Sequence, residues 1–148
     1  AGGIGYLITR NATTAGAEGG CQAEVGSASA MAASAVVELF GGTPRQCMDA
    51  ASLAIVNILG LVCDPIGGLV ENPCQNRNAM GASNALVAAE LVHAGIKSIP
   101  PIDETIEVMY AVGKSIPSEL RETSMGGLAV AKSACETCRA CAEKRKKN

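Results

Sequence analysis

Residues 22–60 read QAEVGSASAMAASAVVELFGGTPRQCMDAASLAIVNILG and predict two helices joined by a tight turn. The first helix is expected to run from Gln22 to Phe40, because the two glycines that follow are typical of a helix end. Thr43 and Pro44 then begin the second helix, and Gln46 completes a capping box with Thr43. This helix is expected to continue to about residue 60, and the pair places the chain in the all-α class.

The composition agrees with a helical domain built from small side chains. The chain has 148 residues, of which 25 are alanine and 17 are glycine, while aromatic residues make up only 2%. Strands favour β-branched and aromatic residues, so a large β-sandwich is excluded. A compact bundle of small-residue-rich helices remains, with enough apolar residues, 48%, to form a core.

Charge and hydropathy exclude several kinds of partner. The net charge of −2 and the near absence of aromatic side chains argue against nucleic-acid binding. The longest nearly apolar run, residues 50–63, is shorter than the roughly 20 residues that span a bilayer. No basic segment followed by an apolar stretch opens the chain, so a signal peptide is not expected, and the cytoplasm is the expected compartment.

The rest of the chain is expected to alternate between short helices and loops. The segment VCDPIGGLVENPCQNR, residues 62–77, is rich in proline, glycine and asparagine and predicts an irregular loop. Helices are predicted over 78–93, over 103–114 with Asp103 as the N-cap, and over 134–144. The loop is more apolar than a surface loop should be, which indicates that it wraps a buried group.

Three of the seven cysteines lie at glycine- or proline-rich breaks: Cys21, Cys63 and Cys74. Their spacing does not match the close cysteine pairs of a zinc ribbon. Three thiolates on separate loops could instead hold three irons of a [4Fe–4S] cluster and leave the fourth iron open. The alternative is that they are buried small apolar side chains, as is expected for Cys47 within the second helix.

Three longer stretches resemble a known family: EGGCQAEVGSASAMAA (18–33), LGLVCDPIGGLVENPCQNRNAMGASNAL (59–86) and SELRETSMGGLA (118–129). They are similar to the iron–sulfur-dependent L-serine dehydratases, also called L-serine ammonia-lyases. The resemblance is to the C-terminal part of the catalytic α chain or α domain. We therefore expect residues 1–131 to be a fragment of that domain, followed by a cysteine-containing basic tail over 132–148.

The resemblance implies a chemistry and a set of ligands. Cys21, Cys63 and Cys74 would hold a [4Fe–4S] cluster that acts as a Lewis acid in converting L-serine to pyruvate and ammonia, without pyridoxal phosphate. This is a reaction of amino-acid catabolism and gluconeogenesis. The intact enzyme would contain the rest of the α chain, a β chain or domain, and two or more subunits.

Other residues in these motifs are candidates for substrate contact. Asn72, Asn76, Arg77 and Asn78 flank Cys74, and a guanidinium suits a carboxylate. The alternative is a network that braces the loop. Glu18 could contact the substrate as well, but a helix cap is its expected role. Structural roles are also expected for Asp64 as a turn former and for His93 at a helix end.

The sequence also departs from the family. A Ser-x-His-Thr segment that full members carry upstream has no counterpart here, so the base that takes the α-proton is expected outside this chain and the fragment alone is expected to be inactive. Near the end stand Cys135, Cys138 and Cys141, for which three interpretations are open. The first is that they are solvent-exposed thiols. The second is that Cys135 binds the open iron as a tail ligand, and the third is that the three cysteines form a second metal site.

Two functions of other classes compete with the dehydratase. A non-catalytic iron–sulfur electron carrier or redox sensor would use the tail cysteines. A purely structural helical domain would keep all thiols reduced and bind no iron.

Overall fold

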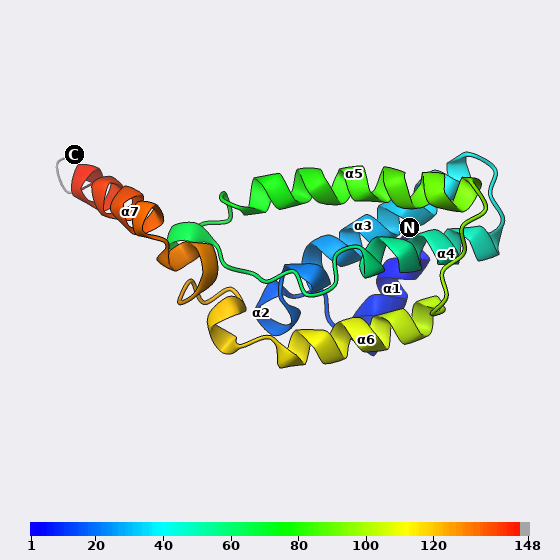
Figure 1. Ribbon diagram of the computed structural model, residues 1–148, viewed down its shortest axis with the longest axis horizontal. Helices are drawn as coiled ribbons and strands as arrows, with labels where there is room; N and C mark the ends of the chain where they lie inside the picture. Colours follow the sequence, from blue (N-terminus) through cyan, green and yellow to red (C-terminus); the bar gives the residue numbers. More distant parts are fainter. Residues whose placement is uncertain (146–148) are drawn as a thin grey trace.

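Figure 1 shows a computed structural model that describes the backbone of residues 1–145 and the side chains of residues 1–138. Within that range the chain is all-α, as predicted, and contains no β-strand, only an isolated bridge between Cys63 and Arg121. The α-helices are α1 (Gly2–Asn11), α2 (Gly16–Gly19), α3 (Cys21–Leu39), α4 (Pro44–Val56), α5 (Cys74–His93), α6 (Ile102–Ser115) and α7 (Lys132–Arg145). Short 3-10 turns lie at η1 (Ile66–Gly68), η2 (Ser118–Leu120) and η3 (Gly127–Val130).

Helix α3 is the centre of the bundle. It packs against α4 and α5, and also contacts α1, α2 and α6, while α7 projects from one end and contacts η1 and η3 (Figure 1). Eight alanines and a few larger side chains such as Ile55, Ile106 and Met109 form the main core. Gly81 of α5 has no room for a side chain, because a Cβ there would lie 2.6 Å from Val25 Cγ1. The small residues therefore let helix backbones approach closely.

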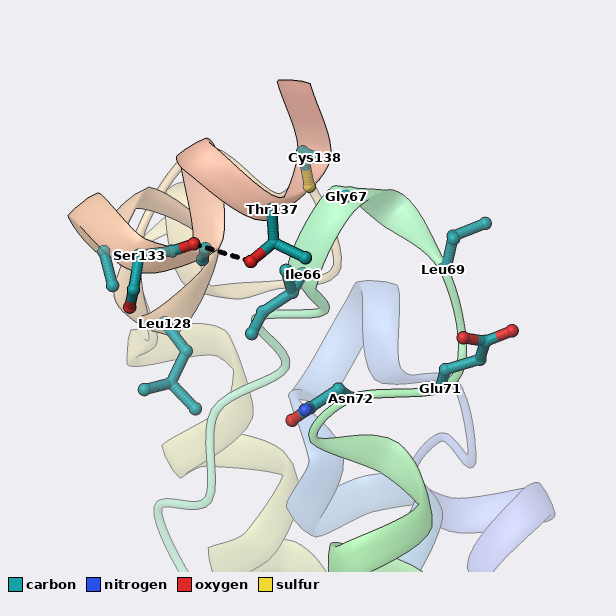
Figure 2. A pocket seen from close by; sticks show the side chains of 11 residues that line it. Ile66, Gly67, Leu69, Glu71, Asn72, Leu128, Ser133, Thr137 and Cys138 are labelled. Atoms are coloured by element: carbon teal, nitrogen blue, oxygen red, sulfur yellow. Dashed lines mark hydrogen bonds between the residues drawn. The ribbon is translucent and has the colours of Figure 1, made fainter. Parts of the chain in front are cut away.

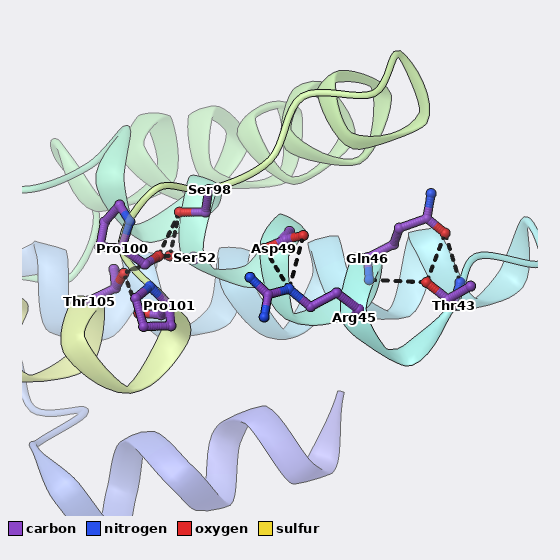
Figure 3. Close-up of polar contacts among 9 residues, drawn as sticks. All are labelled: Thr43, Arg45, Gln46, Asp49, Ser52, Ser98, Pro100, Pro101 and Thr105. Atoms are coloured by element: carbon purple, nitrogen blue, oxygen red, sulfur yellow. Dashed lines mark hydrogen bonds and ion pairs between the residues drawn. The ribbon is translucent and has the colours of Figure 1, made fainter.

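The predicted turn between α3 and α4 is confirmed in detail (Figure 3). Thr43 Oγ1 accepts a hydrogen bond from Gln46 N, and Gln46 Oε1 accepts one from Thr43 N at 2.9 Å. The same figure shows buried hydroxyl groups further along α4. Ser98 Oγ lies 2.8 Å from both Ser52 Oγ and Pro100 O, and Ser52 Oγ donates to the same carbonyl at 2.9 Å, so the linker before α6 is fastened onto α4.

Several helix boundaries differ from the sequence predictions. Helix α5 begins at Cys74 rather than at residue 78, because Pro73 occupies the N-cap, where proline is tolerated. The second helix ends at Val56, and turns follow it to residue 60. Asp103 does not cap α6: the N-cap is Pro101, and Asp103 lies in the first turn, where its charge still opposes the helix dipole. Helix α1 was not predicted.

Among residues 1–145, no helix combines the length and the apolar character that crossing a bilayer requires.

Candidate functional site

Cys21 lies at the first residue of α3 and is 2% exposed. Gly20 before it adopts φ +75°, a left-handed conformation that glycine permits, and a Cβ at this position would lie 2.7 Å from Leu61 O. Gln22 N donates to that same carbonyl at 2.9 Å. The start of α3 is thereby held against the chain that leads to Cys63.

The side chain of Gln22 fixes this junction further. It is almost fully buried, and its Nε2 donates to Met109 O of α6 at 2.8 Å. Its Oε1 accepts a hydrogen bond from Gly60 N at 2.9 Å. One amide therefore connects α3, α6 and the segment after α4, directly beside Cys21.

Cys63 is 3% exposed and lies in the one bridged segment of the described chain. Its N–H donates to Leu120 O at 2.8 Å, and its carbonyl accepts from Glu122 N at 2.7 Å. Gly16 leaves space at the sulfur, because a Cβ on Gly16 would lie 3.1 Å from Cys63 Sγ. Three distant segments of the sequence thus meet around this thiol.

Hydrogen bonding with Cys63 lowers the pKa of Cys21 from 9.0 to about 7; burial opposes the shift, and Arg77 adds to it. The pKa of Cys63 is raised, first by the same hydrogen bond and then by burial. The pKa values of the two neighbouring thiols are therefore shifted in opposite directions.

Cys74 completes the predicted set from the first residue of α5. It is half-buried, and its pKa is raised by burial and then by the charge of Cys21. Among the residues that the structure describes, no three His, Cys, Asp or Glu side chains surround the position of a single metal ion. A four-iron cluster is larger than one ion and separates its thiolate ligands more widely.

Arg77 and Asp64 form a buried ion pair beside the two cysteines. Arg77 Nη1 lies 2.7 Å from Asp64 Oδ1, and the side chains are 14% and 3% exposed. The same nitrogen donates to Val62 O at 2.8 Å and to Cys21 Sγ at 3.7 Å. Burial alone would lower the pKa of Arg77, but Asp64 and Cys21 outweigh it, so the pKa is raised.

The sequence suggested only a turn-forming role for Asp64, but its side chain also links two segments of the site. Its second oxygen accepts a hydrogen bond from Leu128 N at 2.7 Å. Gly127, at φ +59°, leaves no room for a Cβ against that carboxylate. The GGLA motif is therefore fastened to the cysteine-bearing loop by one carboxylate.

The other predicted residues lie at the surface of this region. Asn72, Asn76 and Asn78 are exposed, as is Glu18, and Asn72 lines a cavity. Glu18 makes no side-chain capping bond, but its carbonyl accepts from Arg121. His93 is exposed and meets the Phe40 ring edge-on, with the ring centroids 5.9 Å apart.

Two acidic residues near Cys63 were not predicted as part of the site. Glu24 and Glu122 both raise the pKa of Cys63. Their carboxylates also lie within 3.5 Å of the point where a Cβ on Gly16 would stand. Glu122 has a positive φ of 64°, uncommon for a residue with a side chain. In the sequence, only its place in the motif SELRETSMGGLA could have indicated that Glu122 belongs to the site.

A cavity of about 770 Å³ lies between the η1 loop and α7 (Figure 2). It is lined mainly by apolar groups, including Ile66, Leu69 and Leu128, and it does not include the three predicted ligands. Cys138 faces it and approaches Gly67, where a Cβ would lie 2.9 Å from the sulfur.

The tail cysteines are only partly described. Cys135 and Cys138 are half-buried, and the three interpretations of the tail cysteines stay predictions. Cys135 Sγ donates to Ala129 O at 3.8 Å, so its contact is with the η3 turn just before α7. The side chain of Cys141 lies outside the described residues. Cys47, expected in the core, is half-buried and packs against it.

Comparison with known proteins agrees with the motifs. The family described as serine dehydratase alpha chain matches residues 1–129. The chain is 58% identical to the probable L-serine dehydratase, alpha chain, of Bacillus subtilis (strain 168), covering 87% of this chain and 43% of that protein. It is 59% identical to the L-serine dehydratase, alpha chain, of Peptoniphilus asaccharolyticus, covering 88% of this chain and 44% of that protein. The chain therefore spans less than half the length of these two relatives, and it belongs to the serine dehydratase alpha chain family.

Proposed function

We propose that this chain is the cluster-binding part of an L-serine ammonia-lyase. The observation that carries the proposal is that Cys21 and Cys63 are both buried and that Arg77 Nη1 lies 3.7 Å from the Cys21 sulfur. The motifs that hold this pair belong to a family whose relatives are named L-serine dehydratases.

Cys21, Cys63 and Cys74 are the residues that would hold a [4Fe–4S] cluster. Their surroundings fit such a group in three ways. Cys21 and Cys74 each begin a long helix, where the backbone dipoles favour negative charge. Gly16 leaves space beside the Cys63 sulfur, and Arg77 supplies a positive charge next to Cys21. Bound by three thiolates, the cluster would supply an iron with Lewis acidity toward a substrate oxygen.

The other side chains of the site hold this arrangement in place. Arg77 binds the Val62 carbonyl and Asp64, which ties the loop that carries Cys63 to α5. Asp64 in turn fixes Leu128. We assign substrate contact to Asn72 and Asn78, whose amides flank Cys74 and are exposed to an entering ligand.

The reaction removes water from L-serine to give 2-aminoacrylate, which tautomerises to an imine and is hydrolysed to pyruvate and ammonia. The substrate must lose its α-proton to a positioned base. We assign that base to a part of the enzyme outside these 148 residues. The relatives named alpha chains also suggest a β chain as the partner that completes the site.

The test is anaerobic reconstitution of the intact enzyme with iron and sulfide. We expect bound iron and sulfide, visible thiolate-to-iron absorbance and formation of pyruvate from L-serine. Cys63→Ala should abolish the absorbance and pyruvate formation together, whereas the matched Cys47→Ala should leave both unchanged. Bound iron that cycles reversibly without consuming serine would overturn the proposal in favour of an electron carrier, and an enzyme without iron would overturn the cluster.

A further inference from the structure

Arg121 lies beside Cys63, although the two residues are far apart in the sequence. The two residues are partners in the isolated parallel bridge, through the bonds from Cys63 N to Leu120 O and from Glu122 N to Cys63 O. The backbone of Arg121 is thus paired directly with the backbone of Cys63.

The head of Arg121 reaches the segment that leads into Cys21. Its Nη1 donates to Glu18 O at 3.4 Å, and Glu18 precedes Cys21 by three residues. The guanidinium therefore lies between the two segments that carry the buried cysteine pair.

Most of this guanidinium has no partner in the described part of the chain. Its Nε is shielded from water and is the one buried side-chain nitrogen or oxygen there without a hydrogen-bond partner. No carboxylate oxygen of a described side chain lies within 4.0 Å of it, because the ion pairs found are Arg45–Asp49 and Arg77–Asp64. A buried donor without an acceptor costs stability, so a native protein that keeps one needs a reason.

Arg77, the residue that the sequence suggested for a substrate carboxylate, is already engaged. Its Nη1 contacts Asp64, Val62 and Cys21. A ligand carboxylate that bound at this nitrogen would have to displace the ion pair with Asp64. Arg77 is therefore held to Asp64 through Nη1, whereas Arg121 has no carboxylate partner among the described side chains and keeps an Nε without an acceptor.

We propose that Arg121 binds the α-carboxylate of the amino-acid substrate, an inference that rests on the proposed function. The edge of the guanidinium formed by Nε–H and the neighbouring Nη2 presents two parallel donors, which match the two oxygens of a carboxylate. Binding there supplies the acceptor that Nε lacks. It also places the rest of a small amino acid beside the segments of Cys21 and Cys63.

The test measures binding to the intact, reconstituted enzyme with two probes that cannot undergo elimination, L-alanine and L-alaninamide. They differ only in whether the α-carboxylate is present. Arg121→Gln should weaken L-alanine binding by about 10- to 100-fold, the range for losing a charge-assisted hydrogen bond. It should leave L-alaninamide binding unchanged. Arg45→Gln, the same substitution at an exposed arginine, should change neither.

The discrimination between the two probes separates a binding role from a merely structural one, which would weaken both equally. Equal weakening, or no weakening, overturns the assignment while L-serine turnover by the unchanged enzyme still stands. If the unchanged enzyme neither turns over L-serine nor binds L-alanine, the proposed function fails and this assignment fails with it. Should Arg121→Gln not fold, Arg121→Lys takes its place: a reduced preference for L-alanine supports the assignment and an unchanged preference overturns it.

Discussion

Arg77→Met removes the guanidinium that neutralises the buried Asp64 carboxylate. Methionine keeps the length and much of the apolar volume of the side chain, so the change acts mainly on charge and hydrogen bonding. It deletes the 2.7 Å contact with Asp64 and the 2.8 Å contact with the Val62 carbonyl. Asp64 keeps its bond from Leu128 N but loses the ion pair.

The expected cost is large because both partners are shielded from water. Removing one partner of a buried ion pair typically costs about 3–5 kcal/mol, since the remaining charge stays buried without compensation. For a chain of this size, about 1 kcal/mol shifts the melting temperature by about 2–4 °C, which gives a decrease of about 6–20 °C. The matched change Arg45→Met should cost about 0–1 kcal/mol, because Arg45 is 71% exposed and its pair with Asp49 is screened.

Urea unfolding followed by far-UV circular dichroism would measure these free energies for the metal-free chain. A double-mutant cycle with Asp64→Asn isolates the pair, because Asp64→Asn should cost less in the Arg77→Met background by at least about 1 kcal/mol. The reasoning is refuted if Arg77→Met costs no more than Arg45→Met, or if Asp64→Asn costs the same in both backgrounds.

Two further predictions concern the thiol pair and the close contacts between helices. In the metal-free chain, alkylation of Cys21, followed by peptide mass spectrometry, should rise with pH around a midpoint of about 7, because only the thiolate reacts. Cys63→Ala should move this midpoint up toward 9.0, and Cys63→Ser should move it less. An unchanged midpoint in Cys63→Ala would contradict the hydrogen bonding between the two thiols. Gly113→Ala should lower the free energy of unfolding by about 1–3 kcal/mol, because the new Cβ would lie 2.8 Å from Gly19 Cα. Gly26→Ala should raise the free energy of unfolding by about 0.5–1 kcal/mol, because no atom lies within 4 Å of its new Cβ. Equal melting temperatures for the two variants would refute the close contact between Gly113 and Gly19.

Local features of the fold could be predicted because the residues that decide them are neighbours in sequence. The capping box of Thr43 and Gln46 needs only a three-residue spacing, and the structure confirms it. The start of α5 was predicted too late, because Pro73 and the asparagines after it are typical of loops. Proline at a helix start loses no hydrogen bond, so the helix can begin directly after it.

The site depends on contacts between distant residues, and these could not be worked out from spacing. The resemblance to a family supplied Cys21, Cys63 and Cys74 as a set, and the structure shows the first two in contact. Nothing in the sequence indicated that Asp64 would pair with Arg77, or that Arg121 would lie beside Cys63. Each pairing forms only when loops far apart in the chain have closed.

The two hydrogen bonds of Asp64 also imply an order of assembly. The bond with Arg77 closes a loop of 13 residues, whereas the bond with Leu128 closes one of 64 residues. The longer closure costs more chain entropy, by about 1.4 kcal/mol for flexible loops. We therefore expect the loop that carries Cys63 to be anchored to α5 first during folding. The segment that includes Arg121 and the GGLA motif would close over it afterwards, which leaves the cysteine pair accessible to an incoming ligand until that last step.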